Sequence, residues 1–326
     1  MVEEVAKNIF RIGVVLPDNP LKELNSYLIR GTQSDVLIDT GFRCGVCREA
    51  LTRGLEELGS KPERRDVLLT HIHSDHSGMA DWFAGAGRTI YLCYTDLEYQ
   101  RQILYGDINQ RRNQRFCSEG FPAEQVEHIF QTNPARKMSL PALTDAFRGL
   151  QDGAAITVGE YELQLLHVPG HTPGNAMFWA AKQGILFSGD HVLFDITPNI
   201  TQWEGMKDSL GAYLDSLKRV KNLPVRQTFP GHRKPGNFQD RVEVLLEHHR
   251  QRLAEVLRIV AQTPLLSAYD IAGQMTWKIR ANSWETFPLI QKWFAVGECL
   301  AHLDHLRQIG LIQRTWFDGI WRYQSS

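Results

Sequence analysis

The sequence Thr-His-Ile-His-Ser-Asp-His occupies residues 70–76 and directly follows three apolar residues that are typical of a buried strand. Side chains two positions apart on an extended segment point to the same side, so His71 and His73 can bind one metal ion. Asp75 and His76 follow a turn and can bind a second ion. We therefore interpret this motif as a site for two metal ions at the end of a strand, and not as a solvated polar loop.

Length and composition indicate an ordinary globular protein. The chain has 326 residues, 43% of them hydrophobic, which allows a sizeable core and favours two domains over one. With 36 basic and 37 acidic side chains the net charge is −1, so no global field recruits nucleic acid or an anionic membrane. The N-terminus has no signal-peptide pattern, and no apolar run is long enough to span a bilayer. We expect a cytoplasmic protein that does not contact a membrane.

Five cysteines, an odd number, fit a reducing compartment better than a disulfide framework. Cys44 and Cys47 have Cys-x-x-Cys spacing at the expected start of a helix, where the helix dipole favours a thiolate. The pair is therefore either redox-active or structural. The sequence favours the structural interpretation, because no second Cys-x-x-Cys completes a zinc site.

Strand-like runs open the chain and then alternate with helical patterns. Three early runs read as an antiparallel meander, and the helix that follows carries leucines at amphipathic spacing. A second helix begins after the histidine motif, and another strand follows it. The expected ranges are 9–13, 25–29 and 35–39 for the meander, 48–58 for the helix, 78–83 for the start of the second helix and 88–93 for the strand. This order predicts sheets covered by helices.

Residues 95–150 break the alternation with a mostly helical stretch, and strands are expected to resume only at residue 155. We interpret this stretch as an insertion that forms a lid over the site. Its arginines are either a cationic rim for an anionic substrate or part of a solvated helix face, and the solvated face is favoured. They are Arg101, Arg111, Arg112 and Arg115.

Three further ligand candidates lie in the second half of the chain. His171, Asp190 and His232 each follow a strand and a glycine. Glycines allow the backbone to turn sharply and let a metal approach closely, so several strand ends can converge on one edge of a sandwich. One such residue alone would more often be structural, but three repeats beside the first motif indicate ligands.

Together these residues resemble the metallo-β-lactamase superfamily, whose mark is His-x-His-x-Asp-His followed by a distant His, an Asp and a final His. The resemblance covers residues 9–237 and implies a four-layer αββα sandwich of two mixed sheets flanked by helices. It also implies that Asp39, at the end of a strand, supports the ligands. The ligand sets it implies are His71, His73 and His171 for one metal, Asp75, His76 and His232 for the other, and Asp190 as the bridge between them.

The kinds of ligand atom in this set indicate which metals it binds and which reaction it supports. Imidazole and carboxylate without thiolate suit zinc, which we expect, and also accept iron or manganese. Two cations lower the pKa of a water between them from about 16 towards neutrality and polarise a carbonyl or phosphoryl oxygen. Asp75 is the candidate catalytic residue, because it can orient the nucleophile and pass its proton on. Hydrolysis is the expected reaction.

In its motif the chain resembles the glyoxalase-II-like thioesterase branch of this superfamily, which keeps both metals and the bridging Asp. Antibiotic hydrolysis is disfavoured, because the chain lacks a signal peptide and offers Asp190 where many such lactamases use a cysteine. We expect hydrolysis of a small ester, a thioester such as an acyl-CoA, or a lactone, and this small-molecule substrate can be anionic. The alternatives are a metal-dependent single-strand endoribonuclease and a non-catalytic sensor on the same fold.

Residues 238–326 are expected to form a separate C-terminal domain behind a catalytic domain of residues 1–237. Helices are expected at 238–261, after a capping signal at 267–270, and at 287–309, followed by a hairpin around Asp318-Gly319. This order resembles a winged helix. Residues 265–326 hold six basic and five acidic residues, so we expect a lid or a homodimer contact and no nucleic acid. The basic residues counted are Lys278, Arg280, Lys292, Arg307, Arg314 and Arg322.

Overall fold

The computed structural model describes residues 1–278 and 283–326, so Arg280 lies outside the described residues. The chain divides into two compact units, each of which is described by itself. The first comprises Met1–Tyr105, Pro134–Pro198 and Val220–Val242, and the second comprises Gly106–Asn133, Asn199–Arg219 and Glu243–Ser326. Part of the expected insertion thus belongs to the same unit as the C-terminal residues.

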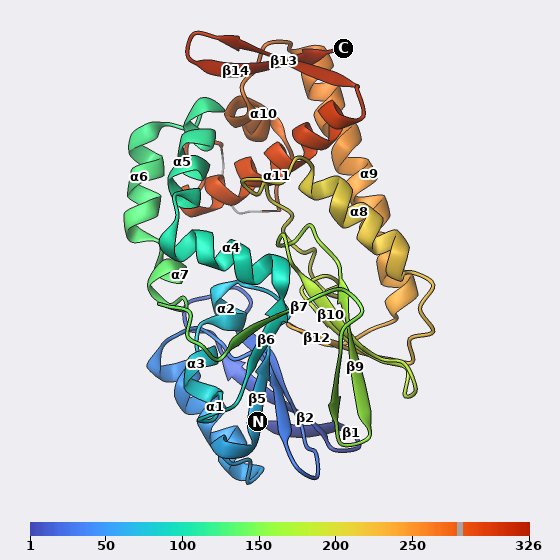
Figure 1. Cartoon of the computed structure of the whole chain (residues 1–326). Helices are drawn as coiled ribbons and strands as arrows, with labels where there is room; N and C mark the ends of the chain where they lie inside the picture. The colour runs from blue at the N-terminus through green and yellow to red at the C-terminus, as the bar shows by residue number, and fades with distance from the viewer. Residues whose placement is uncertain (279–282) are drawn as a thin grey trace. The chain divides into compact units, whose positions relative to one another are not determined.

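A seven-stranded mixed sheet forms one layer of the first unit, with its strands in chain order (Figure 1). Strands β1 to β4 are antiparallel, as expected for the meander, and β4 to β7 are parallel. The strands are β1 (Val2–Ala6), β2 (Ile9–Val15), β3 (Glu23–Ile29), β4 (Asp35–Ile38), β5 (Arg65–Leu68), β6 (Ile90–Cys93) and β7 (Phe147–Leu150).

The prediction that strands resume only at residue 155 was wrong, because β7 lies within the expected helical insertion. Its sequence Phe-Arg-Gly-Leu contains a glycine and two exposed central residues, so it carries a weak strand signal. Parallel pairing with β6, in which Ile90 lies opposite Phe147, stabilises this short strand. Tertiary pairing therefore overrides a weak local preference here.

A five-stranded mixed sheet in the order β12-β11-β10-β9-β8 forms the next layer. Strands β8 to β11 pair antiparallel, and β11 pairs with β12 in parallel. Its strands are β8 (Ala155–Val158), β9 (Tyr161–His167), β10 (Ala176–Ala180), β11 (Ile185–Gly189) and β12 (Gln227–Pro230). The two mixed sheets of the prediction are confirmed.

An apolar core fills the space between the two sheets. Ile29 and Ile38 of the first sheet and Leu165, Phe178 and Phe187 of the second are all at most 1% exposed and belong to one cluster. Burying such side chains stabilises a fold by about 1.5–3 kcal/mol each. The cluster therefore holds the two sheets face to face.

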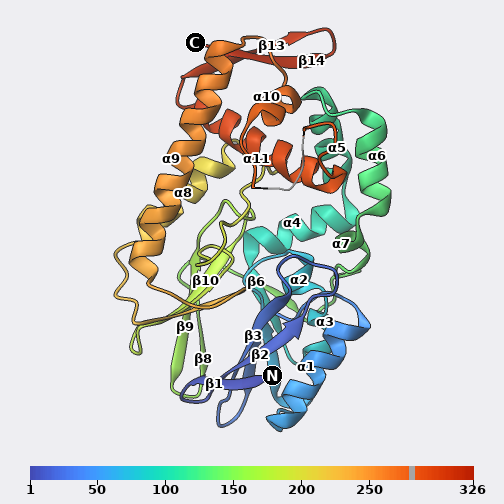
Figure 2. The same ribbon diagram turned by 180° about the vertical axis from the view of Figure 1, so that it is seen from behind.

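Helices cover the other face of the first sheet, where α1 lies beside β2 and β3 (Figure 2). Leu51 and Leu55 of α1 and Leu97 of α4 belong to the same buried cluster as Leu37 and Val67 of the sheet. The helical elements of the first unit are α1 (Gly45–Glu57), η1 (Pro62–Arg64), α2 (Ser74–Ser77), α3 (Ala80–Phe83), α4 (Tyr94–Tyr105) and α7 (Pro134–Lys137), together with the ends of α8 (Ser209–Val220) and α9 (Phe238–Gln262). The helical layer predicted outside the second sheet stays a prediction.

The second unit consists mainly of helices and ends in a hairpin. Ser267 caps α10 through the expected reciprocal capping box with Asp270, and Asp318 and Gly319 both have positive φ in the hairpin turn. Its elements are α5 (Ile108–Ser118), α6 (Ala123–Thr132), most of α8 (Ser209–Val220) and α9 (Phe238–Gln262), α10 (Ala268–Gln274), α11 (Leu289–Gln308), β13 (Ile312–Phe317) and β14 (Ile320–Ser325). The winged-helix interpretation stays a prediction.

A buried carboxylate joins α5 to the C-terminal hairpin within the second unit. Glu119 is fully buried and lies 3.0 Å from Arg115 and 2.8 Å from Arg314 of β13, and it accepts a hydrogen bond of 2.8 Å from Tyr323 of β14. Breaking such a network leaves an uncompensated buried charge. The network explains why residues 106–133 fold with the C-terminal residues.

The arginines of residues 95–150 fit a solvated helix face only in part. Arg101 and Arg111 are exposed and pair with Glu98 and Asp107, three and four residues away in the chain. Arg115 is instead half-buried and pairs with Glu119 and Asp304. No helix within the described residues is both long and apolar enough to cross a membrane.

Replacing Phe178 by alanine should destabilise the first unit by about 3–5 kcal/mol, because it removes an aromatic ring from the core between the sheets. Urea unfolding measures the change. Thr157→Ala, at an exposed position of β8, is the control and should stay within about 0.5 kcal/mol. Equal stability of the two variants would contradict this core assignment.

Candidate metal centre

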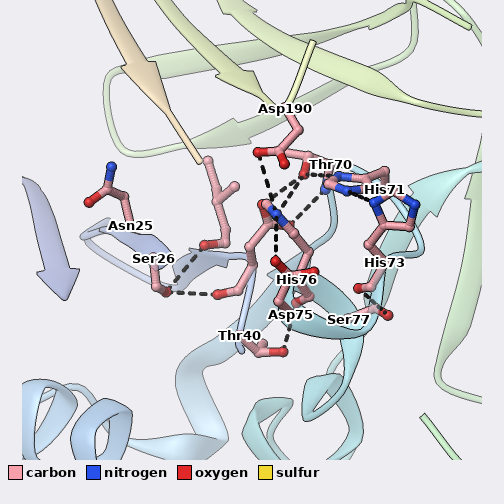
Figure 3. Close-up of polar contacts among 12 residues, drawn as sticks. Asn25, Ser26, Thr40, Thr70, His71, His73, Asp75, His76, Ser77 and Asp190 are labelled. Atoms are coloured by element: carbon pink, nitrogen blue, oxygen red, sulfur yellow. Dashed lines mark hydrogen bonds and ion pairs between the residues drawn. The ribbon is translucent and has the colours of Figure 1, made fainter. Parts of the chain in front are cut away.

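Four segments from the two sheets bring the seven expected ligands together. His71, His73, Asp75 and His76 lie in the loop and short helix α2 that follow β5. The other three follow β9, β11 and β12 of the second sheet. They are His171, Asp190 and His232. Figure 3 shows Asp190 and the imidazoles of the first motif pointing toward one another.

The ligand atoms form three overlapping groups, in each of which all atoms lie within 4.8 Å of one another. The groups are His71, His73 and His171; His71, His76 and Asp190; and Asp75, His76 and His232. The first and third groups coincide with the two ligand sets that the superfamily resemblance implies. Asp190 lies 3.5 Å from His76 and 3.8 Å from His171, so it has access to both sets.

Hydrogen bonds made by the Nδ1 atoms fix the orientation of three imidazoles, those of His71, His76 and His232. His76 Nδ1 donates to Asp39 Oδ2 at 2.7 Å, and His232 Nδ1 donates to the carbonyl of Glu23 at 2.8 Å, because both partners can only accept. His71 Nδ1 lies 3.0 Å from Thr70 Oγ1. Each ring therefore directs the lone pair of Nε2 into the cluster, as a metal ligand requires.

Thr70 and Asp39 form one support for these rings. Thr70 donates its backbone N–H to Asp39 Oδ1 at 2.9 Å and its hydroxyl to Asp39 Oδ2 at 2.7 Å. Since the hydroxyl proton is used, the hydroxyl oxygen accepts from His71. One buried carboxylate thus orients His76 directly and His71 through Thr70.

Burial and the neighbouring imidazoles keep two ligands neutral. They lower the pKa of His73 to about 3 and the pKa of His71 well below its ordinary value. Burial opposes ionisation of Asp75, but His76 and His232 outweigh it and lower its pKa to about 2. Neutral imidazole and ionised carboxylate are the protonation states that bind metal.

The opposite shift occurs where imidazoles face carboxylates. Burial would lower the pKa values of His76 and His232, but Asp190 leads the contacts that raise both. Burial would raise the pKa of Asp190, but His232 and His76 outweigh it and lower that pKa. Positive charge between the buried carboxylate of Asp190 and the rings of His76 and His232 is therefore stabilised.

The residues present fit a pair of divalent cations. His71 Nε2 lies 3.0 Å from His73 Nδ1, and His76 Nε2 lies 3.2 Å from His232 Nε2. Nitrogen lone pairs this close repel each other unless a proton or a cation lies between them. The donor set of imidazoles and carboxylates without thiolate suits zinc, iron or manganese.

Glycine at position 231 allows the second sheet to approach the first motif. A Cβ atom there would lie 2.5 Å from Asp190 Oδ1 and 2.8 Å from His76 Cε1, which is too close for either contact. Gly189, with φ of +48°, packs directly against Thr70. Gly231 is thus required by space, and Gly189 by space as well as by its backbone conformation.

Asp96 is a supporting residue that the sequence reasoning missed. It is fully buried in the first turn of α4 and accepts hydrogen bonds from the Ile72 N–H at 3.1 Å, the Thr172 hydroxyl at 2.7 Å and the Gly174 N–H at 2.6 Å. It therefore joins the loop of His71 and His73 to the loop of His171. The available signal was its position just after β6, which parallels that of Asp39 just after β4.

A cluster of histidines and aspartates at the strand ends of two facing mixed sheets defines a class of metal-dependent hydrolases. Residues 22–232 match the model of the metallo-beta-lactamase superfamily, and residues 253–326 match that of the metallo-beta-lactamase-like C-terminal domain. The chain therefore belongs to the metallo-beta-lactamase superfamily and is a metallo-hydrolase of this family.

Individual proteins support this assignment along the whole chain. A crystal structure of a metallo-beta-lactamase family protein from Thermus thermophilus is 30% identical, with a TM-score of 0.83 over 98% of this chain and 99% of that one. The probable metallo-hydrolase YqjP of Bacillus subtilis is 25% identical over 89% of each chain. The human acyl-coenzyme A thioesterase MBLAC2 is 28% identical over 64% of this chain and 72% of its own length.

Replacing Asp39 by asparagine should lower the affinity for zinc about 10- to 100-fold, because His76 loses its anionic hydrogen-bond acceptor. Competition with a chromophoric chelator measures the affinity. Asp66→Asn is the matched control, since this half-buried carboxylate pairs with Arg88 and should leave zinc binding unchanged. Unchanged affinity in the Asp39 variant would contradict the supporting role.

Asp96 should make the metal-free protein less stable as the pH rises from about 4 to 7. Burial raises its pKa to about 7, although its three hydrogen bonds oppose the shift. Over this window the unfolded carboxyl has lost its proton while the folded one retains it, so stability falls by up to about 1.4 kcal/mol per pH unit.

Urea unfolding of the wild type and of Asp96→Asn at several pH values isolates this contribution. The stability of the wild type relative to Asp96→Asn should fall as the pH rises, because Asp96 titrates and asparagine does not. A difference that grows with pH would show that the pKa of Asp96 is lowered in the fold.

Proposed function

We propose that the protein hydrolyses small acyl compounds, and that acyl-coenzyme A thioesters are its substrates among esters, thioesters and lactones. The observation that carries the proposal is the complete cluster of five imidazoles and two carboxylates. The thioester preference is supported by the similarity to the human acyl-coenzyme A thioesterase over 64% of this chain. The reaction adds water across the thioester bond and yields a carboxylate and a thiol.

Two zinc ions are our proposal for the centre, with iron or manganese as the alternatives that the same donors accept. One set of ligands would be His71, His73 and His171, the other would be Asp75, His76 and His232, and Asp190 would lie between the two. When bound, the cations supply a water that is ionised near neutral pH and polarise the carbonyl oxygen of the substrate.

Asp75 is the side chain that we assign to orienting the attacking water. Its side chain is 13% exposed, whereas those of His76 and His232 are fully buried, so a molecule arriving from solvent can reach its carboxylate. Because its pKa is lowered to about 2, the carboxylate is ionised and accepts a hydrogen bond from water at neutral pH. It holds the water and passes its proton to solvent.

Zinc-loaded protein should hydrolyse acyl-coenzyme A, measured by thiol release. Asp75→Asn should lower kcat about 10²- to 10⁴-fold through loss of the oriented water, and His73→Ala should lose both zinc and activity. Asp66→Asn, away from the centre, should retain the wild-type rate.

A panel that includes a lactone, a β-lactam and single-stranded RNA completes the test. Metal-quantified protein that turns over neither thioesters nor lactones would overturn the proposal. Metal-dependent RNA cleavage with no thioester turnover would instead favour phosphodiester hydrolysis.

A further inference from the structure

Two cysteines face each other at the start of α1, outside the metal centre. Cys44 is the N-cap residue of the helix, and Cys47 lies in its first turn. Their sulfur atoms are 3.4 Å apart, in hydrogen-bond contact. Since a disulfide bond is about 2.0 Å long, the two sulfurs need to approach by about 1.4 Å to bond.

The two thiols differ in access. Cys44 is half-buried and lies at the N-terminus of the helix. Cys47 is fully buried, donates its S–H to the carbonyl of Val15 at 3.1 Å, and has its pKa raised to about 12, with burial the largest cause. An incoming reagent therefore meets Cys44 first and leaves Cys47 to react second.

We propose that Cys44 and Cys47 form a reversible redox site, a dithiol that a low-molecular-weight disulfide oxidises to an intramolecular disulfide. The sequence alone favoured a structural pair, but the contact between the sulfurs and their unequal access fit an attacking thiol and a resolving thiol. Unlike the metal centre, this site would act by thiol–disulfide exchange.

The exchange balances in two steps. The Cys44 thiolate attacks one sulfur of the reagent RSSR, the reagent's S–S bond breaks, and one RS⁻ leaves with the electron pair. Cys47 then attacks the Cys44 sulfur and displaces the second RS⁻. The two cysteine protons pass to solvent and protonate the two thiolates, so the protein loses two electrons and the reagent gains two.

The chain has room for the closure. Cys44 has an extended backbone, with φ of −147° and ψ of 163°, so it lies outside the regular helix and can adjust without unwinding it. The next residue, Gly45, is exposed, and a Cβ atom placed there would meet no atom within 4 Å. In the resolving step Cys47 gives up its hydrogen bond to Val15 as its sulfur moves toward Cys44.

Cys117 provides a matched control within the same chain. It is also half-buried, but it lies in the last turn of α5, where the partial charge of the helix is negative, and burial raises its pKa. Cys93 and Cys299 are buried. Reactivity with a disulfide reagent should therefore be selective for Cys44.

Incubating the full-length, zinc-loaded protein with oxidised glutathione and reading its mass tests the proposal. The wild type should lose two hydrogen atoms and carry no adduct on this pair, and dithiothreitol should restore both thiols. Cys47→Ser should hold one glutathione on Cys44, formed at least about fivefold faster than any adduct on Cys117.

Further variants test whether misfolding, and not the removal of a thiol, explains a change in the adducts. Cys44→Ser should leave Cys47 unmodified, Cys117→Ser should behave as the wild type, and Cys47→Ala should reproduce the adduct of Cys47→Ser. A stable adduct on Cys44 of the wild type, or a rate at Cys44 no greater than at Cys117, would overturn the proposal.

Discussion

The metal centre depends on a set of hydrogen bonds that ties the end of β12 to β3 of the opposite sheet. The Asn25 N–H donates to the carbonyl of Gly231 at 2.7 Å, and the Tyr27 hydroxyl and the Asn25 side chain donate to the carbonyl of Pro230 at 2.8 and 3.0 Å. His232, next in the chain, bonds Glu23 at the start of β3. His232, which follows a strand of one sheet, is thus held at a fixed place against β3 of the other.

The two buried aspartates that follow β4 and β6 extend this principle to the remaining loops. Asp39 has φ of +57°, a strained value for a residue with a side chain, and this conformation is tolerated because its carboxylate accepts three hydrogen bonds. The Asp96 carboxylate likewise accepts hydrogen bonds from two loops, one from Ile72 in the loop of His73 and one from Thr172. Rigid strands carry the ligands close to one another, and buried carboxylates set their final orientation.

The seven residues that the sequence singled out as ligands lie together in the structure because each follows a strand, and strand ends converge by geometry. It did not single out Asp96, because a carboxylate that bonds backbone amides from two distant loops has no motif of its own, and its position after a strand was the one signal. It missed β7 because pairing with β6 stabilises that strand. The insertion expected at residues 95–150 is divided between the two units, and buried ion pairs such as that of Glu119 with Arg314 join residues 106–133 to the C-terminal residues.

The segment between Asp39 and Cys44 connects the metal centre with the cysteine pair. Thr40 donates both its backbone N–H and its hydroxyl to the carbonyl of His76, at 2.7 and 2.9 Å. Gly41, which follows, packs so tightly that a Cβ atom there would lie 2.9 Å from Val14. A segment held this firmly at one end transmits displacement poorly, so closure of the Cys44–Cys47 bond would be absorbed on the helix side, where Gly45 is open to solvent. Thiol chemistry and hydrolysis can therefore occupy neighbouring segments without one disturbing the other.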